Sequence, residues 1–180
     1  MGKVRFVSKC LKWVFAACII LFPVLQVVLW SHADRPIFFH FGSTFLPSGV
    51  DLVSLEASAA KTKFLCFSIS MVPTGIVMGV CFLLVRLLSL YAKGIIFEPV
   101  NVSLIKKIAY LLLVKAVIGP IYEGALTAVW TMSKPVGQRM FYLSTQTVNL
   151  TGIIIVLMIL VVAWVMAEGQ KLQQEQQLTI

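Results

Sequence analysis

The sequence has little charge and few of the residues that usually carry out chemistry. Charged side chains make up 12% of its 180 residues, about half the share found in soluble domains, and two residues are histidine. There is no HExxH zinc motif, no GxSxG nucleophile motif, no phosphate-binding glycine loop and no CxxC pair among the four cysteines. We therefore expect no enzyme activity, no cofactor and no metal site.

The charge that is present is mostly positive. Fifteen Lys and Arg stand against seven Asp and Glu, which gives a formal net charge of +8. Because the basic residues are spread along the chain and do not form a block or a helical stripe, we do not expect direct binding to nucleic acid. The lipid bilayer is the expected partner.

Apolar residues are abundant: 59% of the side chains are hydrophobic, and the mean hydropathy is +0.96. Four apolar runs stand out, at 13–30, 64–90, 108–130 and 148–167. Each can roughly cross a hydrocarbon core about 30 Å thick at about 1.5 Å per residue. The sequence predicts an all-α, polytopic membrane protein: a four-transmembrane-helix bundle, one domain over 1–180, with a tail at 168–180.

The first run has a second interpretation, because basic residues precede it and Ser31-His32-Ala33 follows it, as in a cleaved signal peptide. The run is longer than the usual apolar core of a signal, so an uncleaved helix is favoured. The segment 31–63 that follows is long and aromatic, with Ser48 and Asp51 at the spacing of a helix cap. It is interpreted as a lid at the membrane interface or as a ligand or partner surface.

Basic residues also predict the orientation. The N-terminal tail, the segment between the second and third runs and the C-terminal tail hold eight Lys and Arg, against five in the other two connections. This bias places both termini in the cytoplasm. Trp30 and Trp130 would then lie at the outer interface.

Polar residues inside the runs are the first candidates for function, because a charge at bilayer depth is costly and faces protein or water. Glu123 lies about 10 Å below the outer surface, by helix rise, and Gln26 and Asn149 fall in the same outer third of their runs. We predict an intramembrane polar cluster of Glu123, Gln26, Asn149 and Tyr122. It is either a structural hydrogen-bond network or a transport site.

At the inner side, Arg86 and Lys115 lie close enough to the ends of their runs to extend toward lipid phosphates, as do Lys106 and Lys107 in the preceding connection. The alternative is an inner basic pocket that binds an anion or Glu168 of the tail. Gly75 and Gly79 form a GxxxG pair, which allows close helix packing within the bundle or in a homo-oligomer.

The glutamine-rich tail would continue the fourth helix into the cytoplasm, helped by Lys171 and Glu175 four residues apart. It is either a solvated helix end or a docking peptide. The partner-binding segment would then combine the inner connection with the tail, through the candidate residues Phe97, Glu168, Gly169, Leu172, Leu178 and Ile180.

Two short motifs resemble a known family. They are the tail pattern of Glu168-Gly169, Leu172, a Gln/Glu run and Leu178-Thr-Ile180, and the inner segment Gly94-Ile-Ile-Phe97 with Asn101-Val and Ile105-Lys-Lys. Both resemble a bacterial family of four-helix integral membrane proteins of unknown function, domain of unknown function 2975. Here glutamines replace much of that family's tail charge. The resemblance implies a bacterial inner membrane and a helix-turn-helix regulator as a partner, and no catalytic residues.

Together these features predict a multi-pass membrane protein without enzyme activity that binds a partner, such as a cytoplasmic regulator. The alternative is a small-solute or ion transporter that uses Glu123 as its cation or proton site.

Overall fold

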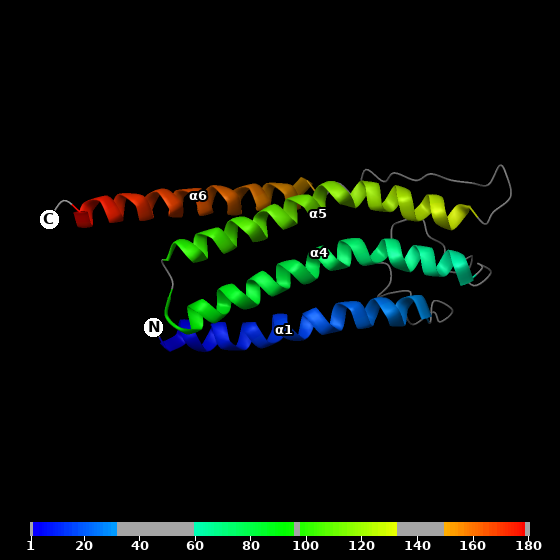
Figure 1. Cartoon of the computed structure of the whole chain (residues 1–180), viewed down its shortest axis with the longest axis horizontal. Helices are drawn as coiled ribbons and strands as arrows, with labels where there is room; N and C mark the ends of the chain where they lie inside the picture. The colour runs from blue at the N-terminus through cyan, green and yellow to red at the C-terminus, as the bar shows by residue number, and fades with distance from the viewer. Residues whose placement is uncertain (1, 32–59, 96–97, 133–149, 179–180) are drawn as a thin grey trace. The chain divides into compact units, whose positions relative to one another are not determined.

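The computed structural model describes residues 2–31, 60–95, 98–132 and 150–178. Within these residues the chain forms four α-helices and no strand, which confirms the all-α prediction (Figure 1). The expected helix near Ser48, with most of the 31–63 segment, lies outside the described residues. The four helices are α1 (Gly2–Ser31), α4 (Ala60–Ala92), α5 (Pro99–Thr131) and α6 (Leu150–Leu178).

Three of these helices are long and apolar enough to cross a membrane, over Arg5–Ser31, Lys61–Ala92 and Leu150–Lys171. The fourth, α5, is not among them, and its apolar part contains Lys115 and Glu123. Large apolar side chains on the spanning helices are exposed, such as Trp13 at 75% and Val165 at 66%. Apolar surface on this scale is unfavourable in water and normal in lipid, so these are helices of a membrane protein.

The helices extend beyond the apolar runs from which they were predicted. α5 begins nine residues before its run, at Pro99, whose fixed φ suits the first position of a helix. α6 continues from its apolar part to Leu178, which confirms that the tail is helical. Polar flanks therefore prolong each span into the headgroup region or beyond.

A glycine cap ends α4. Gly94 has a φ of +86°, the N–H of Gly94 donates to the carbonyl of Tyr91 at 3.0 Å, and that of Ile95 donates to Leu90 at 3.1 Å. This pair of bonds is a Schellman motif, which requires the left-handed conformation that glycine adopts without strain. The Arg5 guanidinium of α1 lies so close that a Cβ built on Gly94 would be 2.7 Å from Nη2.

Asn101 fixes the start of α5 beside this cap. It is fully buried, and its side-chain Nδ2 donates to the backbone carbonyl of Ile95 at 2.9 Å. The segment that joins α4 to α5 is thus tied at both ends, by the glycine cap and by this amide.

The chain divides into two compact units that share three helices. Unit 1 consists of Met1–Ile20, Ile76–Lys115 and Asn149–Ile180, and unit 2 of Leu21–Gly75 and Ala116–Val148. The N-terminus, the α4–α5 connection and the C-terminal tail all belong to unit 1.

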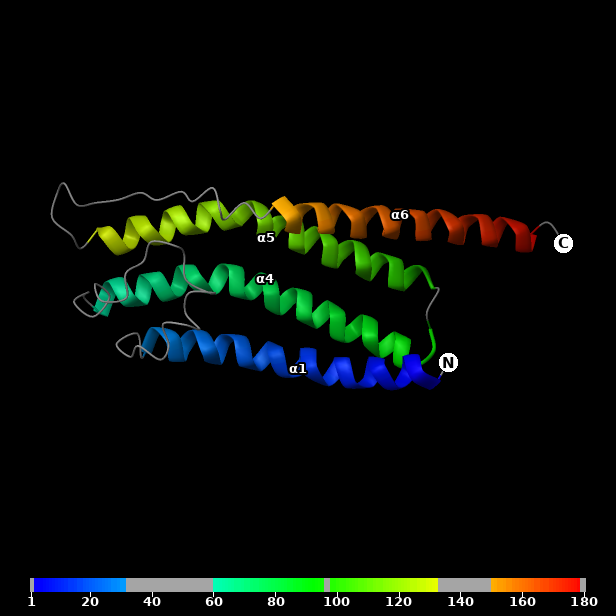
Figure 2. The same ribbon diagram turned by 180° about the vertical axis from the view of Figure 1, so that it is seen from behind.

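Apolar packing holds unit 1 together. One cluster joins α4 to α5 around Val80, Leu87, Leu104 and Ile108. A second joins α5 to α6 around Ala109, Val156 and Leu160, and the two helices run side by side in both views (Figures 1 and 2).

The core of unit 2 is smaller, and its helices contain proline. Cys66, Leu126 and Trp130 form its buried cluster, with Trp30 packed against them. Trp130 is 5% exposed and packs inside the unit; that it lies at the outer interface stays a prediction. Pro23, Pro73 and Pro120 each lie within a helix, where proline removes one backbone hydrogen bond.

Candidate functional site

A chain of hydrogen bonds crosses unit 2 and links three helices. Gln26 of α1 donates from Nε2 to the Thr74 hydroxyl of α4 at 3.2 Å. Thr74 in turn donates to the backbone carbonyl of Ser70 at 2.8 Å. The Ser70 hydroxyl lies 3.3 Å from the phenol oxygen of Tyr122 on α5. Gln26, Ser70 and Thr74 are buried, so these bonds form away from solvent.

The direction of the last bond follows from counting protons. A serine hydroxyl has one hydrogen, and that of Ser70 is donated to the carbonyl of Cys66 at 2.8 Å. The Tyr122 phenol must therefore donate to Ser70. The phenol oxygen retains its lone pairs as acceptors inside the unit.

Glu123, next to Tyr122, is the one buried acidic residue among the described residues, at 6% exposed. Its backbone carbonyl accepts a hydrogen bond from the Thr127 hydroxyl at 2.8 Å, and Thr131 repeats this bond one turn later onto Thr127. Glu123, Thr127 and Thr131 are spaced four residues apart, so they lie along one buried polar face of α5.

Three of the four residues predicted for the polar cluster belong to unit 2 and are described. Gln26 and Tyr122 both bond to α4, at positions one turn apart. Glu123 is buried beside Tyr122, whereas Asn149 lies outside the described residues. The cluster as a whole stays a prediction.

The sequence reasoning missed Ser70 and Thr74, through which the chain passes. Cys66, Ser70 and Thr74 are spaced by four, and all three are buried. A stripe of small and hydroxyl side chains along one face of an apolar helix was the signal that would have found them.

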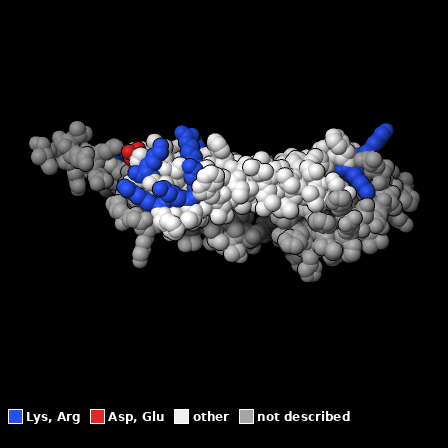
Figure 3. Space-filling model, turned by 90° about the horizontal axis from the view of Figure 1, so that it is seen from below, with Lys and Arg blue, Asp and Glu red and all other residues white. Residues whose placement is uncertain are grey.

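The basic residues predicted to contact lipid fall into two groups. Arg86 and Lys115 are exposed on α4 and α5. Lys106 and Lys107, near the start of α5, line a groove together with Lys171 of α6. Figure 3 shows Lys and Arg side chains gathered in the left part of one face, with little acidic surface among them. Ten of the 15 Lys and Arg, and three of the seven Asp and Glu, belong to unit 1.

The candidate helix-packing glycines differ from each other. A Cβ on Gly79 would lie 3.5 Å from Leu111 of α5, which is ordinary van der Waals contact. A Cβ on Gly75 would meet nothing within 4 Å. Gly79 therefore faces α5, and Gly75 is exposed.

Most of the candidate partner segment is visible only as backbone or not at all. Phe97 and Ile180 lie outside the described residues, while Leu172 and Leu178 are within the helical part of α6. Glu168 pairs with Lys171 at 3.2 Å, and both side chains are exposed. Gly169 is exposed, with open space around its Cα.

Among the residues of α1, α4, α5 and α6 and their described flanks, no three His, Cys, Asp or Glu side chains are grouped closely enough to hold a metal ion. The cysteines there are Cys10, Cys18, Cys66 and Cys81, and all are free thiols.

These observations define an all-α protein with membrane-spanning helices, a buried polar chain and a basic end. The chain belongs to the family described as Protein of unknown function (DUF2975), whose profile matches residues 48–180. This confirms the resemblance seen at Gly94 to Phe97, Asn101 and the tail, and the match includes α4, α5 and α6. No curated protein matches the chain. No solved structure matches it either.

Proposed function

We propose that this is a four-span protein of a bacterial inner membrane, without enzyme activity, that binds a cytoplasmic regulator through the tail and the α4–α5 connection. The observation that carries the proposal is the unbroken length of α6. Its 29 residues span about 44 Å, whereas its apolar part, 150–167, needs about 27 Å of bilayer. The remainder would rise about 16 Å above the hydrocarbon core, within reach of a soluble protein.

Three features support α5 as a span, together with α1, α4 and α6. It is 33 residues long, it packs between α4 and α6 in unit 1, and its outward side chains Val117 and Ile121 are apolar and exposed. Its one buried acidic residue faces protein, as an intramembrane charge does.

Four spans would leave both termini on one side of the membrane. The basic excess of unit 1, which contains both termini and the α4–α5 connection, supports the cytoplasm as that side. A green fluorescent protein fused after Ile180 should fluoresce, and alkaline phosphatase inserted within 133–149 should be active. An inactive phosphatase there would contradict the topology.

Partner binding can be tested by photocrosslinking in membranes. The full chain, with a photoreactive residue at Leu178, is co-expressed with a helix-turn-helix regulator of the kind that the family resemblance implies. We expect a specific adduct, and loss of that adduct when Leu172 and Ile180 are changed to Gln. The control changes Gln173 and Gln176 to Ala, which leaves the apolar side chains of the tail in place. An adduct unaffected by the first pair would contradict docking through the tail.

A transporter is the second candidate, and the burial of Glu123 beside the polar chain favours it. A carboxylate inside a span is a common cation or proton site. In proteoliposomes, Glu123→Gln should abolish cation-driven flux, and Ser68→Ala should not, because Ser68 is exposed and bonds within its own helix. Equal flux in wild type and Glu123→Gln would exclude this function.

A further inference from the structure

A groove between α5 and α6 has the composition of an anion site. Its volume is about 500 Å³, and it lies wholly within unit 1. Its polar lining consists of Ser103, Lys106, Lys107 and Tyr110 from α5 and of Gln170 and Lys171 from α6. Three ammonium groups and several hydrogen-bond donors therefore face one volume from two helices.

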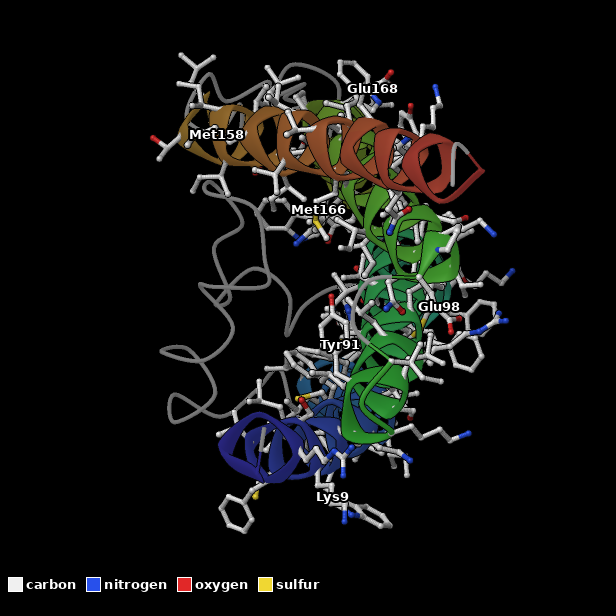
Figure 4. The ribbon with its side chains drawn as sticks, turned by 90° about the vertical axis from the view of Figure 1, so that its left-hand side faces the viewer. Lys9, Tyr91, Glu98, Met158, Met166 and Glu168 are labelled. Carbon is white, nitrogen blue, oxygen red and sulfur yellow. The ribbon has the colours of Figure 1, made fainter. Side chains whose placement is uncertain are left out.

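The local charge remains positive after the nearby carboxylates are counted. Glu168 pairs with Lys171 at 3.2 Å, and Glu98 stands exposed just before α5. Figure 4 shows Glu168 and Met166 on opposite sides of α6. Glu175, four residues after Lys171, is the third acidic residue of unit 1, and the ten Lys and Arg of this unit outnumber all three. The positive end of the α5 dipole begins at Pro99, which also lines the groove.

The switch from apolar to polar residues along both helices would put the groove at the depth of lipid phosphates. On α6 its residues begin at Ala167, where the apolar part of the helix ends, and on α5 they straddle the start of the run at Ile108. Toward the bilayer, Ala109, Val156 and Leu160 seal the two helices together. Trp164 is exposed on α6, one turn before Ala167 and two turns before Lys171, so it lies on the groove side of the helix and offers apolar surface to an acyl chain.

We propose that this groove binds the phosphate-bearing headgroup of an anionic phospholipid, with Lys106, Lys107 and Lys171 around the phosphate and the acyl chains along α6. Phosphate is the shared chemistry of a lipid headgroup and a free phosphate ion. The exposed apolar side chain of Trp164 next to the lysines, which a free ion cannot use, favours the lipid. The groove shares Gln170 and Lys171 with the tail proposed to bind the regulator, but lipid binding is measured here without any regulator.

The test uses the full chain in a neutral detergent. Native mass spectrometry measures the binding of dioleoyl phosphatidylglycerol and, as a reference, of dioleoyl phosphatidylcholine with the same acyl chains. The triple variant Lys106→Gln, Lys107→Gln, Lys171→Gln should bind phosphatidylglycerol at least about tenfold more weakly, since each lysine near a membrane surface contributes several-fold. Circular dichroism checks that each variant retains its helices.

The matched control removes three lysines of unit 1 that do not line the groove: Lys9→Gln, Lys12→Gln, Lys93→Gln. Figure 4 shows Lys9 on α1, at the opposite end of the unit from Glu168 of α6. We expect less than a twofold change. Equal losses in both triple variants, or equal binding of the two lipids by the wild type, would overturn the proposal. So would displacement of the lipid by an equal concentration of inorganic phosphate, which would assign the groove to the free ion.

Discussion

The two units of the molecule are built from parts of the same helices but are held together differently. Unit 1 has two apolar clusters and most of the Lys and Arg. Unit 2 has one small apolar cluster, the hydrogen-bond chain from Gln26 to Tyr122, and every proline found inside a described helix. Unit 1 therefore depends on side-chain packing, and unit 2 adds polar bonds where proline weakens the backbone ladder.

This difference suggests a division of tasks. Charged groups at the end of a span suit contacts with lipid phosphates and soluble partners. Buried polar groups in a low-dielectric interior suit a unique helix arrangement or an ion site. Substitutions in each unit should separate packing from hydrogen bonding as the source of stability.

The largest effect is expected from a cavity in unit 1. Leu104 is 3% exposed and packs with Val80, Leu87 and Ile108, so Leu104→Ala should lower the free energy of unfolding by about 2 to 5 kcal/mol. Steric trapping in bicelles measures it. The control, Leu157→Ala on the exposed face of α6, should change stability by no more than about 0.5 kcal/mol. Equal losses would mean that packing does not dominate unit 1.

The next effect concerns the glycine cap. Gly94→Ala should cost about 1 to 2 kcal/mol, because a side chain in the left-handed region is strained. The new Cβ would also displace the Arg5 guanidinium. The same unfolding assay measures the loss. Gly169→Ala is the control: its Cβ meets open space in a helix, where alanine is the better residue. A stable Gly94→Ala protein would contradict the cap.

A smaller effect is expected in unit 2. A double-mutant cycle with Gln26→Leu and Thr74→Val should give a coupling energy of about 0.6 kcal/mol, and no more than about 1.7 kcal/mol. These are the average and the maximum for hydrogen bonds between membrane helices. A second cycle pairs Gln26→Leu with Ser68→Ala and should give no coupling, since Ser68 bonds only to Phe64 of α4 in the structure. Zero coupling in the first cycle would remove the link between α1 and α4.

The smallest effect is expected for the exposed ion pair. Glu168→Gln breaks the 3.2 Å contact with Lys171 and should change stability by less than about 0.5 kcal/mol. The comparison is Gln170→Glu, which adds a negative charge two residues after Glu168. It checks whether the local charge affects stability. A loss as large as that of Leu104→Ala would show that charge stabilises unit 1 more than packing does.

The helices were predictable because an apolar run of this length can form all its backbone hydrogen bonds in lipid within one helix, and few other structures allow this. The start of α5 was not predicted, since its backbone bonds continue through the polar flank 99–107. The extension of α6 through 168–178 was predicted, from Lys171 and Glu175 four residues apart. In the sequence Asn101 stood out only as part of the family motif, and only the fold reveals that its amide bonds to Ile95.

Only part of the candidate site was predicted, because some of its residues stand out in an apolar sequence and others do not. Glu123, Gln26 and Tyr122 stand out in sequence because they carry a charge, an amide and a phenol at bilayer depth. Ser70 and Thr74 do not stand out, because small hydroxyl residues cost little in an apolar helix and hydropathy barely registers them. The burial of Trp130 against Cys66 and Leu126 was not predictable, because aromatic belt rules consider depth along a helix and ignore which face is buried.

The hydroxyl groups have a further consequence, for how the chain enters the membrane. Seven serine and threonine side chains donate to the carbonyl four residues earlier in their own helix: Ser31, Ser68, Ser70, Thr74, Ser89, Thr127 and Thr131. Such a bond needs no second helix. Each span can therefore leave the insertion machinery with these groups already satisfied, so α4 can reside in lipid before α5 has been synthesised.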